Sequence, residues 1–261
     1  MAQDFTRLAC IALVAVIGIR SAAAAERPEF GAKIGTNTSQ VDAVSDFYAT
    51  ELRPANPINA RSGAGLIVGG FVMVPITGRL GLEGEVLFSQ QRHHVDVPPT
   101  ALCSSCALRA TFTRAYLDAA VLPKCDFVRG RRISFYAMAG PVFSFMTHAD
   151  FETDDPTIRR GDPYRDIYYV TTLPYGTAEL LKSNLVSIVV AGGTVIRRLS
   201  VEVRFSRSLQ PIFSDRSTML DALVKLGGSR SNLDRFYLTE VAPILDRAKS
   251  RNVSILLGFR F

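Results

Sequence analysis

The chain has 261 residues, of which 48% are apolar, so it can bury a sizeable core and is not globally disordered. It has no Trp and only 3 His, which leaves few candidates for chemistry based on histidine. The formal net charge is +6, but the basic residues are scattered along the sequence, whereas nucleic-acid binding usually needs a contiguous basic patch. A nucleic-acid partner is therefore not expected.

The first 25 residues have the layout of a secretory signal peptide. A short polar start with Arg7 is followed by apolar or small residues from Leu8 to Ile19, and small residues then continue to Ala25. This apolar run is too short for a spanning helix, which needs about 20 residues. We therefore expect residues 1–25 to be removed on export and residues 26–261 to form a single domain.

Eight later segments alternate apolar and polar residues with the period of two that is typical of β-strands. The seventh is the clearest, because Leu199, Val201 and Val203 alternate with polar residues. The last, NVSILLGFRF, alternates as regularly up to Phe261. The predicted strands are residues 30–39, 65–76, 80–92, 112–127, 133–149, 185–196, 199–209 and 252–261.

The connections between the predicted strands alternate in length. Tight turns, with the sequences TGR, VRGRR and RR, join the second strand to the third, the fourth to the fifth and the sixth to the seventh. The long connections lie at residues 40–64, 93–111, 150–184 and 210–251. Short turns at one end and long loops at the other are typical of an outer-membrane barrel. The predicted fold is all-β, an eight-stranded antiparallel transmembrane up-and-down β-barrel with long external loops.

A soluble barrel would show the same alternation with its apolar face inside, so further features are needed. The clear strands have about 10 to 13 residues, close to the 9 to 11 that cross a bilayer when tilted. The last strand runs to the final residue, as expected of a strand that closes a ring. Aromatic residues also recur near strand ends, as in an interfacial girdle: Phe88, Phe127, Phe135, Phe145, Phe259 and Phe261.

Four strand sequences carry a family resemblance. They are FGAKIGTNTS in the first strand, LGLEGEVLFSQQ in the third, AYLDAAVLPK in the fourth and FYAMAGPVFSF in the fifth. These resemble the porin-like outer-membrane β-barrel domain family, small eight-stranded Gram-negative proteins of the Bacteroidetes type. The resemblance implies an outer-membrane location and no single activity. It also implies that Phe261 is the assembly signal, so the expected partners are outer-membrane lipid and the outer-membrane insertion machinery.

With apolar side chains facing lipid, the lumen would receive five acidic and four basic side chains, whose charges nearly cancel. An eight-stranded barrel has an interior just wide enough for side chains to fill. We therefore expect these charges to be structural and to close the lumen by ion pairs, with Lys124 meeting Glu83 or, after a shift in register, Glu85. The nine residues are Lys33, Glu83, Glu85, Asp118, Lys124, Asp126, Glu202, Arg204 and Arg260.

Three histidines, His93, His94 and His148, lie at the loop ends of the third and fifth predicted strands. Some eight-stranded outer-membrane barrels modify lipids with a histidine and a serine, so Ser89 or Ser144 is a candidate nucleophile. The two strands are not neighbours, and no acidic partner is evident at the spacing of a triad. We expect a non-enzymatic protein without cofactor, metal or catalytic residues. The alternatives are a lipid-modifying barrel enzyme and a soluble periplasmic barrel that binds an apolar ligand.

The sequence CSSC, from Cys103 to Cys106, lies in the second long connection. It lacks the strand-to-helix context of a redox motif and the second cysteine pair of a zinc site. An exported chain meets oxidising conditions, so we expect a disulfide between these two residues. Cys125 would then remain a free thiol on the apolar face.

Overall fold

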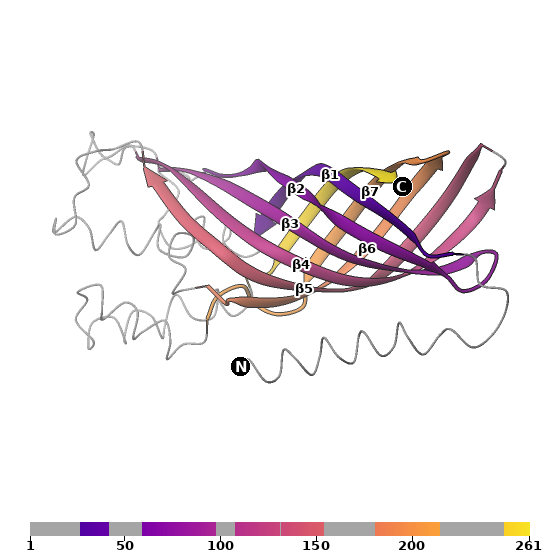
Figure 1. Ribbon diagram of the computed structural model, residues 1–261. Coiled ribbons are helices and arrows are strands. Elements are labelled where there is room, and N and C mark those ends of the chain that lie inside the picture. The colour runs from indigo at the N-terminus through magenta and orange to yellow at the C-terminus, as the bar shows by residue number, and fades with distance from the viewer. Residues whose placement is uncertain (1–26, 42–58, 98–107, 131, 154–180, 215–247) are drawn as a thin grey trace.

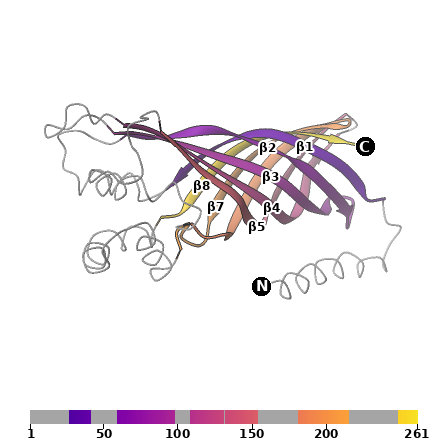
Figure 2. The same cartoon turned by 60° about the vertical axis from the view of Figure 1, so that its left-hand side comes forward.

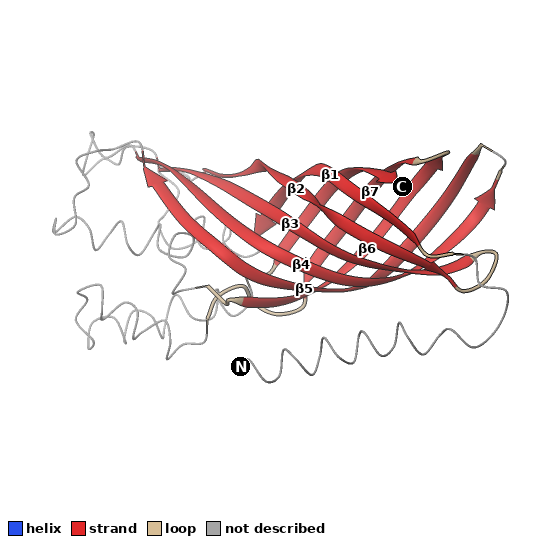
Figure 3. Ribbon diagram, viewed as in Figure 1, coloured by secondary structure: helices blue, strands red, loops and turns tan. Residues whose placement is uncertain are grey.

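The chain forms a closed antiparallel barrel in which the eight strands pair in chain order and β8 returns to pair with β1 (Figures 1 and 3). The computed structural model describes residues 27–41, 59–97, 108–130, 132–153, 181–214 and 248–261. The strands are β1 (Glu29–Val41), β2 (Asn59–Pro75), β3 (Leu80–Val97), β4 (Leu108–Arg129), β5 (Ile133–Thr153), β6 (Asn184–Ile196), β7 (Leu199–Ser208) and β8 (Ser250–Arg260). The predicted fold class and number of strands are confirmed.

The closing seam joins the first strand to the last. Its register runs from Gly31 opposite Arg260 to Val41 opposite Ser250, so neither strand leaves an open edge. The Phe261 N–H donates a further hydrogen bond to the Phe30 carbonyl at 2.9 Å. Closure matters because an unpaired backbone edge cannot be satisfied by hydrocarbon.

The two faces of the barrel wall differ sharply in chemistry. Leu257 and Val203 on the outer face are 56% and 53% exposed, whereas Glu83 and Glu202 on the inner face are 0% and 1% exposed. A soluble barrel has the opposite arrangement, because its apolar side chains form the core. The alternative of a soluble barrel is therefore wrong, and the outer face is suited to lipid.

Four strands exceed their predicted length by four residues or more. β2, β3, β4 and β5 have 17, 18, 22 and 21 residues, and they extend beyond the other strands at the end opposite the tight turns (Figures 1 and 2). Parts of the predicted loops are therefore strand. The reason is that pairing continues beyond the predicted strand ends, with β3 and β4 in register as far as Val97 opposite Leu108.

Aromatic residues mark the limits of the apolar band. At the turn end, the rings of Phe127 and Phe135 stack at 6.4 Å between centroids, and those of Phe259 and Phe261 meet edge to face at 5.7 Å. Phe88 does not lie at a strand end, because β3 continues beyond it. It is the ninth residue of β3, at about the length that crosses a bilayer.

Two sequence predictions lie outside the described residues, namely the signal peptide at residues 1–25 and the disulfide between Cys103 and Cys106. Cys125 is exposed on the outer face and is a free thiol. Within the described ranges, no helix has the length and apolar character needed to cross a membrane.

Candidate functional site in the lumen

The turn half of the lumen is occupied by an ion-pair layer, defined as Lys33, Glu83, Glu85, Lys124, Glu202 and Arg204. Lys33 is its centre. Its Nζ lies 2.5 Å from Glu83 Oε1, 2.5 Å from Glu85 Oε1 and 3.1 Å from Glu202 Oε2. One cation from β1 therefore joins carboxylates from β3 and β7 across the lumen.

Two further cations complete the ion-pair layer. Arg204 donates from Nη1 to Glu85 Oε2 at 2.7 Å and from Nη2 to Glu85 Oε1 at 2.5 Å, and its Nε donates to Glu202. Lys124 Nζ lies 2.7 Å from Glu83 Oε2, the contact expected from the sequence. The layer thus holds three cations and three carboxylates, with zero net charge and an oppositely charged contact for each member.

An aromatic residue connects the ion-pair layer to the apolar side of the lumen. Tyr136 donates a hydrogen bond to Glu202 Oε2 at 2.7 Å, and Lys124 Nζ lies 3.8 Å from the centre of its ring. A Cβ at Gly193 would lie 2.5 Å from the Tyr136 hydroxyl, so only glycine leaves space for this ring. Buried apolar neighbours of Tyr136 fill the rest of this height: Ala120, Leu122, Met138, Val189, Ala191 and Val195.

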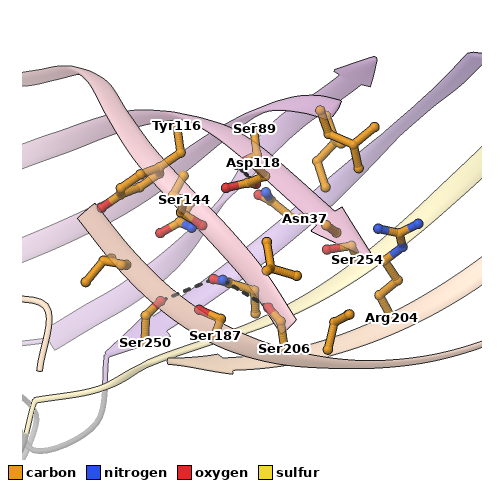
Figure 4. Close-up of a pocket in the computed structure, with 18 of the residues that line it drawn as sticks. Asn37, Ser89, Tyr116, Asp118, Ser144, Ser187, Arg204, Ser206, Ser250 and Ser254 are labelled. Atoms are coloured by element: carbon orange, nitrogen blue, oxygen red, sulfur yellow. Dashed lines mark hydrogen bonds between the residues drawn. The ribbon is translucent and has the colours of Figure 1, made fainter. Parts of the chain in front are cut away.

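Nearer the loop end, the lumen holds a cavity of about 70 Å³ that is lined by both polar and apolar side chains (Figure 4). We call it the serine chamber, and its polar lining includes Asn37, Ser89, Tyr116, Asp118, Ser144, Ser187, Ser206, Ser250, Asn252 and Ser254. Ser89 donates a hydrogen bond to Asp118 Oδ2 at 2.6 Å. The volume gives room for roughly five water molecules, at 10–15 Å³ each.

A second polar group lies toward the loop end from the serine chamber. Arg114 is 1% exposed, and its Nη2 lies 3.2 Å from Gln91 Oε1 and 2.6 Å from His93 Nε2. A guanidinium can only donate, so Nε2 of His93 accepts this bond. Ser39 also donates to Gln91 Oε1 at 3.2 Å. These contacts tie β1, β3 and β4 together at this height.

Six of the nine charges predicted for the lumen meet in the ion-pair layer, and three lie elsewhere. Asp118 lines the serine chamber. Arg260 is at the turn end, where its Nη1 lies 2.7 Å from Glu29 Oε2. Asp126 lines a small pocket at the same end with Arg79. Arg260 and Asp126 each lie two residues closer to the turns than the ion-pair layer. On β8, Gly258 is the residue that pairs with Lys33, and on β4, Lys124 of the layer precedes Asp126 by two residues.

The sequence analysis missed three residues of this lumen, namely Arg114, Glu29 and Tyr136. Arg114 lies four residues before the predicted lumen residue Asp118 on β4, so the alternation of the strand would have placed Arg114 inside as well. Glu29 shares the phase of Lys33 in the same way. Tyr136 was harder to find, because β5 is rich in apolar residues, and its sequence does not show which of its aromatic side chains point into the lumen.

The residues considered for an enzyme are not assembled into a triad. Ser89 and Ser144 both line the serine chamber, with Asp118 between their strands. His93 contacts Arg114, and His94 Nδ1 lies 3.0 Å from Thr111 Oγ1. Among the described residues, no histidine lines the chamber, and no group of three His, Cys, Asp or Glu side chains could hold a metal ion.

Comparisons with known proteins agree with this architecture. A family model described as "Outer membrane protein beta-barrel domain" matches residues 2–214. No curated protein matches the chain.

Three solved structures illustrate the similarity. Ail, the attachment invasion locus protein of Yersinia pestis, solved with the heparin analogue sucrose octasulfate, is 13% identical with a TM-score of 0.38, over 90% of this chain and 100% of that one. Neisserial surface protein A is 10% identical, with a TM-score of 0.41 and the same coverage. OprG from Pseudomonas aeruginosa is 12% identical, with a TM-score of 0.38, over 90% and 94% of the two chains. Because the family match spans most of the sequence, the chain belongs to the outer-membrane protein β-barrel domain family, and it is an outer-membrane protein.

Proposed function

We propose that the protein is a non-enzymatic outer-membrane barrel whose lumen is closed to solutes and whose role lies in interactions at its loop end. The observation that carries the proposal is the balanced ion-pair layer. None of its six side chains is more than 6% exposed. A solute would have to separate charges that contact each other directly inside a narrow lumen, which is costly.

The loop end supports the second half of the proposal. β2 to β5 continue the barrel wall beyond the apolar band, with exposed side chains such as Arg61 and Arg92 on this extension. Outer-membrane barrels carry their longer connections on the external side. A rigid wall that reaches past the bilayer is a suitable support for binding segments, because loops held by a rigid scaffold commonly carry recognition.

The inward orientation of the two candidate nucleophiles, Ser89 and Ser144, supports a non-enzymatic role. A lipid-modifying enzyme needs its nucleophile within reach of a lipid ester at the outer face of the barrel. Ser89 and Ser144 instead line an interior cavity, and the hydrogen-bond partner of Ser89 is a carboxylate rather than an imidazole. Lipid ester bonds outside the barrel are separated from these hydroxyls by the strand wall.

Experiments on reconstituted protein test two claims, that the lumen is closed to solutes and that the protein is not a lipid-modifying enzyme. Proteoliposomes should show no swelling in arabinose beyond protein-free vesicles, and mass spectrometry of phospholipid and lipid A incubated with the protein should detect no released fatty acid. Arabinose entry would contradict the closed lumen. Fatty-acid release that disappears in Ser89→Ala or Ser144→Ala would contradict the non-enzymatic role.

We also propose that Phe261 is read by the outer-membrane insertion machinery. Its side chain is 77% exposed beside Phe259, so its contacts within the barrel are limited. Phe261→Asp should therefore lower the amount of assembled protein in cells much more than it lowers refolding in detergent. Equal losses in the two assays would make Phe261 an ordinary residue of the aromatic girdle.

A further inference from the structure

The turn end of the barrel gathers arginines from segments that are far apart in the sequence. We call this set the turn rim, and it comprises Arg27, Arg79, Arg132, Arg197, Arg198 and Arg260. Among the residues that the structure describes, two acidic side chains, Glu29 and Asp126, lie at the same end, and Glu29 pairs with Arg260. Basic residues that look scattered in the sequence therefore form one positively charged end in the folded protein.

The backbone of the turn rim is ordered by hydrogen bonds between neighbouring segments. The Asp126 N–H donates to the Arg79 carbonyl at 2.8 Å, and the Arg260 N–H donates to the Arg198 carbonyl at 2.9 Å. The Arg197 N–H donates to the Arg132 carbonyl at 3.4 Å. The exposed guanidinium groups of the rim are thus carried on a fixed frame.

One turn of the rim has an unfavourable backbone conformation. Arg197 and Arg198 form the two-residue connection between β6 and β7, and Arg197 has a φ of 58°. Glycine and asparagine are preferred at such a position, because a larger L-residue is strained in the left-handed region. Strained residues are enriched at functional sites, so Arg197 is a candidate for a functional side chain.

The turn rim lies next to exposed apolar side chains, which indicates its level in the membrane. Exposed apolar side chains, Ile196 and Leu199, lie on either side of the Arg197–Arg198 turn, and the aromatic pairs of the turn end lie at the same height. The arginines therefore sit where hydrocarbon gives way to water. Short turns of outer-membrane barrels face the periplasm, so this level corresponds to the headgroups of the periplasmic leaflet.

The distribution of charge indicates the kind of partner. The three turns join β2 to β3, β4 to β5 and β6 to β7, and Arg27 and Arg260 lie beside the seam between β8 and β1. The arginines are thus spread around the whole circumference. A protein partner would need one compact patch, whereas lipid headgroups surround the barrel as a ring.

We infer that the turn rim binds anionic phospholipid headgroups of the periplasmic leaflet, with Arg197 and Arg198 as its strongest site. Guanidinium groups donate two parallel hydrogen bonds to a phosphate, which suits this ligand. Basic side chains beside an anionic membrane surface also attract it electrostatically, and this attraction falls as salt rises.

The full-length protein in phosphatidylcholine vesicles provides the test. Spin-labelled phosphatidylglycerol and spin-labelled phosphatidylcholine are added separately, and electron paramagnetic resonance measures the fraction of each that is immobilised by the protein. The wild type should prefer phosphatidylglycerol about three- to fivefold, which corresponds to roughly one effective arginine contact per bound lipid. The preference should fall at high salt.

Two double variants separate the turn rim from net charge. Arg197→Asn with Arg198→Asn should remove at least half of the preference without lowering the urea midpoint of unfolding, because asparagine fits the turn. Arg61→Gln with Arg92→Gln removes two exposed arginines at the loop end and should leave the preference unchanged. No preference in the wild type, or equal losses in both variants, would overturn the inference.

Discussion

The ion-pair layer and the serine chamber occupy neighbouring heights of one lumen, yet they fill it in different ways. In the ion-pair layer, Lys33 alone contacts three carboxylates, and the side chains leave little space between them. In the serine chamber, a cavity of about 70 Å³, most of the polar side chains are short hydroxyls, and the Asp118 carboxylate accepts a hydrogen bond from the Ser89 hydroxyl. A cluster of buried charges is stable only when opposite charges contact each other, whereas hydroxyl groups can be satisfied by water. Closure is therefore expected to depend on the layer and not on the chamber.

Removing the central cation should have the largest effect on stability. Lys33→Met leaves three carboxylates with fewer cations, so the free energy of unfolding should fall by about 3–5 kcal/mol. Urea titration of protein refolded in detergent, followed by far-UV circular dichroism, measures this loss. A loss below about 1 kcal/mol would contradict the network, because it would mean that Lys33 does not hold these carboxylates.

The peripheral cation of the ion-pair layer should matter less than the central one. Lys124 contacts the single carboxylate of Glu83, so Lys124→Met should cost about 2–3 kcal/mol. Adding Glu83→Gln should recover part of the loss. Recovery is incomplete because Glu83 also contacts Lys33. Strictly additive losses in this double-mutant cycle would show that Lys124 and Glu83 do not interact.

The same tyrosine substitution can be made in both regions. Tyr136→Phe removes a hydrogen bond to the Glu202 carboxylate and should cost about 1.5 kcal/mol. Tyr116→Phe removes a hydroxyl from a residue that lines the serine chamber and should cost less than about 1 kcal/mol. Equal losses of unfolding free energy would remove the distinction between the layer and the chamber.

The smallest effect is expected inside the serine chamber. Ser187 lines the cavity, and Ser187→Ala enlarges a space that already has room for water, so the free energy of unfolding should change by less than about 0.5 kcal/mol. The measurement is the same urea titration. A loss above about 2 kcal/mol would indicate that the hydroxyl of Ser187 belongs to an essential network like that of Lys33.

Strand alternation was sufficient to predict the inward face of this barrel. It placed Glu83 and Glu85 on one face of β3, and the antiparallel pairing of β3 with β4 brought Lys124 within reach of Glu83. The offset of two residues, with Gly81 rather than Glu83 opposite Lys124, follows from the stagger of barrel strands.

Other features depend on three-dimensional closure and could not be predicted. Lys33 is the centre of the ion-pair layer because it reaches across the lumen to β3 and β7, neither of which pairs with β1. The serine chamber depends on how side chains pack at one height of the lumen. The turn rim was hidden because its arginines are distant in the sequence and meet only when the strands close into a ring.

Single-channel recording in planar bilayers tests the central claim, that the ion-pair layer closes the lumen, most directly. Wild-type protein, shown to be folded by its heat-modifiable mobility on a gel, should give no stable conductance steps at any applied voltage that the bilayer tolerates. This result is expected because the charges of the layer are paired and almost fully buried. Reproducible conductance steps in the nanosiemens range from the wild-type protein would contradict the account.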